Sequence, residues 1–212
     1  MIIRILALLL IALCAPQAWS QQPALAPTSP PATSVKVLDT RLALRDLWVE
    51  HTFWVRNYAV ANQAGNAAQA ETAAKEVVAN ATAIANSLQP LYGQPAADQM
   101  LTLLAGHWNA IKSYSDASVA KDSAKQEAAK GLLETNGKAI AAFLAKANPY
   151  LPETSLVTLL SAHGGHHISQ IDQLAKADYA GEAKTWHAMH EHILGIADAL
   201  ADALAKQFPE KF

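Results

Sequence analysis

The stretch MLTLLAGH, residues 100–107, recurs 56 residues later as LVTLLSAH, residues 156–163. The copies share a threonine, two leucines and the closing histidine, and His51 stands a further 56 residues before His107. A second set of positions keeps the same interval: Asn80, Asn136 and His192; Ile84, Ile140 and Ile196; Leu88, Leu144 and Leu200. Such a period is typical of a repeated supersecondary unit. Equivalent residues of the units could meet, so the three histidines are candidates for one shared site.

Good helix formers (Ala, Leu, Lys, Gln and Glu) dominate the chain from residue 35 onward. Segments rich in Gly, Pro and Asn interrupt them and predict helix ends. We expect six helices, at residues 36–64, 67–89, 95–118, 121–147, 153–178 and 181–206. The short connections favour antiparallel neighbours. The sequence therefore predicts an all-α, up-and-down bundle of three helical hairpins of about 56 residues each, related by a pseudo-repeat.

The first twenty residues have the pattern of an export signal. Arg4 precedes a short apolar run, and Ala18-Trp-Ser20 offers a cleavage site before Gln21. The run is too short to span a bilayer, so we expect a periplasmic or secreted protein with no stable membrane insertion after cleavage. Residues 21–34, rich in proline, are expected to be a disordered tether. Residues 35–212 are then the single bundle domain.

The charge and cysteine content exclude several classes of protein. Removing Arg4 from the 16 basic residues leaves 15 against 18 acidic ones, a charge of −3 with neutral histidines. No basic stripe is present, so nucleic acid is not an expected partner. Cys14, the only cysteine, would leave with the signal. The mature chain would then offer neither a thiolate ligand nor the C-x-x-C-H site of covalent haem.

The eight histidines all fall within expected helices. His163, His166 and His167 form H-x-x-H-H, and His187, His190 and His192 form H-x-x-H-x-H. Side chains three or four residues apart share a helix face, so such pairs can bind one ion together. Imidazole suits copper, zinc, nickel and iron, whereas calcium and magnesium prefer oxygen. Asn80 and Asn136, at mid-height of their helices, are expected to hydrogen-bond inward imidazoles.

The segment LWVEHTFWVRN, residues 47–57, and the tail KQFPEKF, residues 206–212, resemble a group of small exported bacterial all-helical proteins without an established activity. The resemblance covers about residues 42–212. It implies an acidic residue before each of the three repeat histidines, where this chain has Glu50 but then Gly106 and Ala162. It also implies a site histidine at His190. Some members carry a glycosyltransferase label, but a small all-helical chain without a nucleotide-sugar site gives that label no physical support.

Register and resemblance together predict a metal site. We expect His51, His107, His163 and His190 as an inner set, one from each of four helices, and His166, His167, His187 and His192 as a second tier. Because neutral imidazole is the ligating form, binding is expected to weaken as the pH falls through about 6.5.

The favoured function is an exported, histidine-rich bundle that binds a late transition metal (copper, zinc, nickel or iron) for sequestration, sensing or delivery. One alternative is a non-covalent haem protein or a metal-dependent redox protein or enzyme. Another is a helical interaction module whose histidines only pack. No G-x-S-x-G elbow, phosphate-binding glycine loop or H-E-x-x-H motif occurs. We therefore assign no catalytic residue and favour binding over catalysis.

Overall fold

The computed structural model describes residues 34–212, which form a bundle of α-helices. In chain order these are α1 (Val35–Gln63), α2 (Ala67–Ser87), α3 (Gln89–Tyr92), α4 (Gln94–Val119), α5 (Ser123–Ala147), α6 (Glu153–Ala175) and α7 (Tyr179–Gln207). Residues 34–212 contain no strand, so the predicted all-α bundle is confirmed. None of these helices combines the length and apolar character that crossing a bilayer requires. The expected signal peptide and all but the last residue of the expected tether lie outside the described residues.

The six long helices begin and end within three residues of the predicted positions. The single turn α3 was not predicted, because it contains Pro90 and is followed by Gly93, and both residue types usually interrupt helices. Proline is tolerated in the first turn of a helix, where its missing N–H has no partner to lose. Gly93, with a φ of 82°, then ends α3 in a conformation that favours glycine.

One turn geometry closes all three hairpins. The second residue after each first helix has a left-handed backbone, with φ of 70° at Gly65, 54° at Lys121 and 57° at Ala177. The next residue, Asn66, Asp122 or Asp178, donates its amide to a carbonyl five residues back at 2.9 Å and caps the following helix with its side chain. These bonds match the Schellman motif at helix C-termini.

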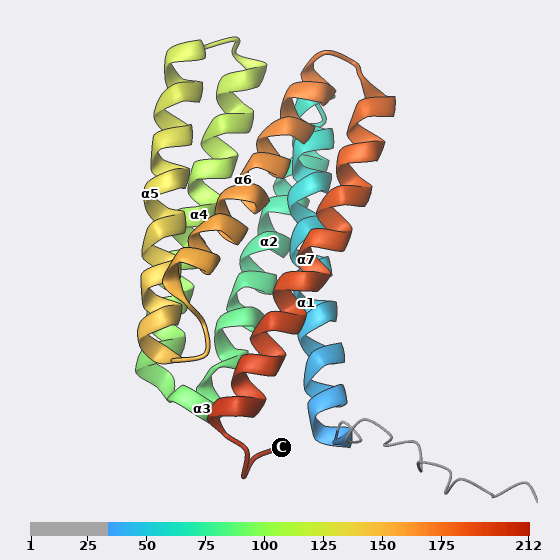
Figure 1. Cartoon of the computed structure of the whole chain (residues 1–212). Helices are drawn as coiled ribbons and strands as arrows, with labels where there is room; N and C mark the ends of the chain where they lie inside the picture. The colour runs from blue at the N-terminus through green and yellow to red at the C-terminus, as the bar shows by residue number, and fades with distance from the viewer. Residues whose placement is uncertain (1–33) are drawn as a thin grey trace, which may run out of the picture. The chain divides into compact units, whose positions relative to one another are not determined.

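The three first helices, α1, α4 and α6, all contact one another. Each second helix packs against its own partner and also against the first helix of another hairpin: α2 on α4, α5 on α6 and α7 on α1. Figure 1 shows the chain reversing at alternate ends of the bundle, as the up-and-down prediction requires. The contact between α7 and α1 brings the last helix of the bundle against the first. Superposition of the whole hairpins stays a prediction.

The buried apolar side chains form two clusters, one towards each end of the bundle. On α1, Trp48 belongs to the first cluster and Val55 to the second, with His51 between them. On α4, Leu104 and Ile111 stand in the same relation to His107. A layer of imidazoles therefore interrupts the core near the middle of the central helices.

Candidate metal centre

Four histidines from three helices meet in this layer: His51 of α1, His107 of α4, and His163 and His167 of α6. One ring nitrogen from each lies within 4.8 Å of those of the other three. All four side chains are buried, with exposed fractions of 2–4%. Four buried imidazoles this close together could hold a metal ion.

His163 and His167 already stand at ligating separation. They are four residues apart on α6 and therefore share a face of the helix. Their Nε2 atoms lie 3.2 Å apart, so one of them donates a hydrogen bond to the other. Two nitrogens on a tetrahedral zinc ion, at bonds of about 2.0–2.1 Å, are about 3.3 Å apart. An ion could therefore replace this hydrogen bond, and the wider pairs would close around it.

Each hairpin ties its cluster histidine through the same backbone contact. Asn80 Nδ2 donates to the Leu47 carbonyl at 3.0 Å, Asn136 Nδ2 to the Leu103 carbonyl at 2.9 Å, and His192 Nε2 to the Leu159 carbonyl at 3.0 Å. Each carbonyl belongs to the residue four positions before His51, His107 or His163. It is the oxygen that accepts the amide of that histidine in a regular helix. The second helix of every hairpin thus holds the turn that carries an imidazole.

The two asparagines therefore play a different part from the one expected, because their amide groups bond helix carbonyls and not imidazoles. Their Oδ1 atoms are buried without a partner, as are Nδ1 of His51, both ring nitrogens of His107 and Nδ1 of His163. Asn136 lies near enough to His107 to oppose the lowering of its pKa, although no hydrogen bond of normal geometry joins them. Unpaired buried polar atoms are costly, and other protein groups do not satisfy these nitrogens and oxygens.

Burial keeps the four imidazoles neutral. Burial, with a smaller contribution from repulsion by a protonated His107, lowers the pKa of His51 to about 3. Burial also lowers the pKa of His107 to about 4. The pKa values of His163 and His167 are also held well below the usual range, by burial first and then by the neighbouring histidines. The ligating form therefore persists below the pH of about 6.5 expected from an unperturbed histidine.

The structure groups His167, and not His190, with the three repeat histidines. His190 is half-buried beside Trp186, with ring centroids 6.3 Å apart. It lies outside the cluster because α7 packs against α1 and α6 and does not enter the group of central helices. The sequence signal that favoured His167 was its spacing of four from His163, which had placed it only in the second tier.

The other second-tier histidines lie around the cluster or away from it. The ring of His192 is 6.4 Å from that of His163 and 5.5 Å from that of His166, by centroids. Burial lowers the pKa of the half-buried His166, and His192 adds to the effect. His187 is exposed.

Within residues 34–212, no carboxylate joins the four imidazoles. Glu50, the acidic residue beside His51, is exposed and accepts a hydrogen bond from Asn80 Nδ2 at 3.1 Å. A Cβ at Gly106, the equivalent position in the second hairpin, would lie 2.8 Å from Asn136 Nδ2. In this second hairpin, Asn136 therefore approaches the helix more closely than a side chain at position 106 would allow.

Glu182 is a buried acid near the start of α7, and its charge is balanced by an arginine. Its two oxygens accept hydrogen bonds of 2.6 Å from Nε and Nη2 of Arg56, and one also accepts from Gln170 at 2.9 Å. The Arg56 guanidinium lies over the Trp186 ring, 5.3 Å from its centroid. This group braces α1, α6 and α7 but lends the histidine cluster no net charge.

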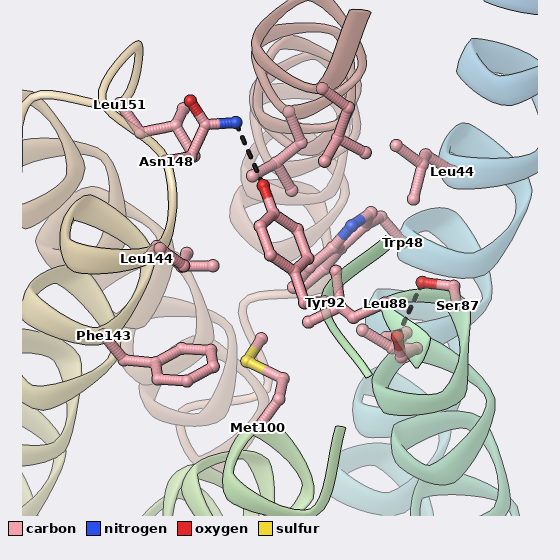
Figure 2. A pocket seen from close by; sticks show the side chains of 14 residues that line it. Leu44, Trp48, Ser87, Leu88, Tyr92, Met100, Phe143, Leu144, Asn148 and Leu151 are labelled. Carbon is pink, nitrogen blue, oxygen red and sulfur yellow. Dashed lines mark hydrogen bonds between the residues drawn. The ribbon is translucent and has the colours of Figure 1, made fainter. Parts of the chain in front are cut away.

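A small apolar cavity of about 40 Å³ lies beyond Trp48, in the cluster of side chains near α3. Figure 2 shows Leu44, Met100 and Leu144 in its wall, with the Tyr92 hydroxyl accepting from Asn148 Nδ2 at 3.2 Å. The same hydroxyl donates to Gln207 Oε1 at 2.6 Å, so its hydrogen bonds are made within the protein. Trp48 packs edge-on to His51 with centroids 6.0 Å apart, and separates the cavity from the histidines.

No protein-family model, curated protein or solved structure matches the chain. The resemblance to small exported helical proteins stays a prediction.

Proposed function

We propose that this protein is an exported metal-binding protein that holds a late transition metal ion on His51, His107, His163 and His167 for sequestration, sensing or delivery. The observation that carries the proposal is the cluster itself: four buried imidazoles within 4.8 Å of one another, several with unpaired nitrogens. Metal coordination would use the nitrogens that face one another. The remaining Nδ1–H groups would need hydrogen-bond acceptors. The unpaired Oδ1 atoms of Asn80 and Asn136 are acceptors of the right kind.

The donor set favours a bare ion of copper, zinc, nickel or iron. All four ligands are nitrogen, which these metals accept and which calcium and magnesium do not prefer. The ring centroids of the four histidines all lie 4.6–6.3 Å from one another, so a haem placed between any two rings would overlap the other two. Four ligands also fill a tetrahedral ion, whereas catalytic zinc sites keep one position open. These features support binding over catalysis.

Thermal melting of chelator-stripped protein tests the proposal. Zinc, copper, nickel or iron that binds only the native state must raise the melting temperature. At a free ion concentration of 100 times Kd, the free energy of unfolding rises by about 2.7 kcal/mol. An unchanged melting temperature with all four ions would favour the interaction module with structural histidines. A Soret band in protein purified from its native compartment would favour haem.

Two pairs of variants assign the ligands. We expect His107→Ala to cost far more affinity in a metal titration than His187→Ala, because His187 is exposed. We expect His167→Ala to cost far more than His190→Ala. If His190→Ala abolishes binding and His167→Ala does not, the fourth ligand is the one the resemblance implies.

A further inference from the structure

The candidate ligand set carries no negative charge. All four members are buried imidazoles, and imidazole binds a metal in its neutral form. Glu50 is exposed and bonded to Asn80, and Glu182 is paired with Arg56. An ion on these four nitrogens would therefore keep its full charge inside the bundle.

The cost of that charge depends strongly on its size. In the Born description, the free energy of moving an ion from water into a low-dielectric interior rises with the square of the charge, so a divalent ion costs about four times as much as a monovalent one. Buried divalent ions are normally compensated by carboxylate, thiolate or hydroxide. Apolar side chains above and below the imidazole layer, such as Trp48 and Ile111, offer no such compensation.

We propose that the four-histidine cluster selects monovalent copper, Cu(I), over divalent ions. The proposal rests on the proposed metal-binding function and names its cargo. Copper is among the metals that imidazole binds, and it has a stable monovalent state. Cu(I) has a filled d shell and imposes no fixed geometry, so it suits nitrogens held at unequal separations, 3.2 Å for one pair and up to 4.8 Å for others.

The decisive experiment uses the full mature chain and two measurements. Under anaerobic conditions, Cu(I) is titrated against a chromogenic Cu(I) chelator, and Cu(II) and Zn(II) against chelators of their own. The midpoint potential of the copper-loaded protein is then measured with redox mediators, using the Cu(II) paramagnetic signal. We expect Cu(I) to gain at least about tenfold in affinity over Cu(II) relative to the aqueous couple, which is a rise of about 59 mV for a one-electron couple.

A charge added to the ligand set gives a matched test. His167→Asp places one carboxylate among the ligands, and His187→Asp adds the same charge at an exposed position. We expect His167→Asp to lower the potential and to move the preference towards Zn(II) and Cu(II), and His187→Asp to leave both unchanged. Circular dichroism checks that each variant folds. If His167→Asp does not fold, the potential of the wild-type protein still decides the question.

The possible failures are distinguishable. A wild-type potential at or below the aqueous value, or Zn(II) binding tighter than Cu(I), would overturn the selectivity and leave metal binding intact. A Zn(II) affinity that rises with chloride, or with pH above 7 where the ligand histidines are already neutral, would show that a bound anion supplies the missing charge, which also overturns it. If none of the ions binds, the proposed function itself is wrong.

Discussion

His192 Nε2 lies 3.0 Å from the backbone oxygen of Leu159, in the contact that an asparagine amide makes in each of the two preceding hairpins. A carbonyl can only accept, so the Nε2 atom of His192 carries the proton. His192 is therefore placed to position the turn before His163, and its Nε2 is engaged with the backbone.

The equivalence with Asn80 and Asn136 predicts the behaviour of two variants at His192. His192→Asn should keep the hydrogen bond and the metal affinity. His192→Ala should lose the bond and about 0.5–1.5 kcal/mol of unfolding free energy. Urea unfolding and metal titration of both variants provide the check. Loss of metal binding in His192→Asn would mean that His192 is itself a ligand.

The left-handed residues at the hairpin turns predict two stabilising substitutions. Gly65 occupies this position in the first hairpin, whereas Lys121 and Ala177 hold it with φ of 54° and 57°. A residue with a Cβ pays roughly 1–2 kcal/mol in this conformation. Lys121→Gly and Ala177→Gly should each raise the unfolding free energy by about 1 kcal/mol. Gly65→Ala, the reverse change at the equivalent turn, should lower it, and equal melting temperatures across the three would contradict the turn assignment.

The ion pair between Arg56 and Glu182 predicts non-additive effects on stability. Glu182 is 4% exposed and Arg56 34%. Arg56→Met would leave a buried carboxylate unpaired, which typically costs about 3–5 kcal/mol. The double variant Arg56→Met with Glu182→Met should recover most of that loss, because no buried charge remains. Thermal unfolding of the two single variants and the double variant measures the coupling.

Stability of the metal-free protein should fall in mild acid. The pKa is about 3 for folded His51 and about 4 for folded His107, against about 6.5 in the unfolded chain. Between these values the unfolded state binds more protons, so stability rises with pH. It should be fully present above pH 6.5 and decline towards pH 4, by up to about 1.4 kcal/mol per pH unit for each histidine. His51→Gln should flatten this slope, and a slope unchanged in that variant would contradict the assignment.

Metal binding should survive to lower pH than a surface histidine site would allow. Protons compete for the ligand nitrogens of the folded protein only near the lowered pKa values, about 4 for His107. We therefore expect the affinity to change little between pH 7 and pH 5.5, and to fall steeply below that as the protein also loses stability. A titration midpoint near pH 6.5 would show that the ligands are not the four buried histidines.

The all-α bundle could be predicted because good helix formers fill the chain and breakers mark where the helices end. The 56-residue spacing of His51, His107 and His163 predicts which residues are equivalent, and superposition of the whole hairpins stays a prediction. The left-handed backbone at Lys121 and Ala177 gave no such signal, since neither is glycine. Those turns are imposed by the capping aspartates that follow them and by packing of the helices.

The fourth member of the histidine cluster could not be predicted because it depends on helix rotation. The rise along the helix predicts similar heights for His167 and His192, but which side of α7 faces the centre follows from its packing against α1 and α6. Spacing alone favoured His163 with His166 or His167 equally, and only the packed structure selects His167.

The four imidazoles come from positions 51, 107, 163 and 167, and therefore from all three hairpins. A chain emerging from its amino end would present His51 first, but the set is incomplete until the last hairpin has docked. One hairpin alone offers at most two of the four ligands, so partly assembled chains should hold an ion only weakly. Loading is thus tied to the completion of folding, and a bound ion would mark those molecules whose first and last thirds have been joined.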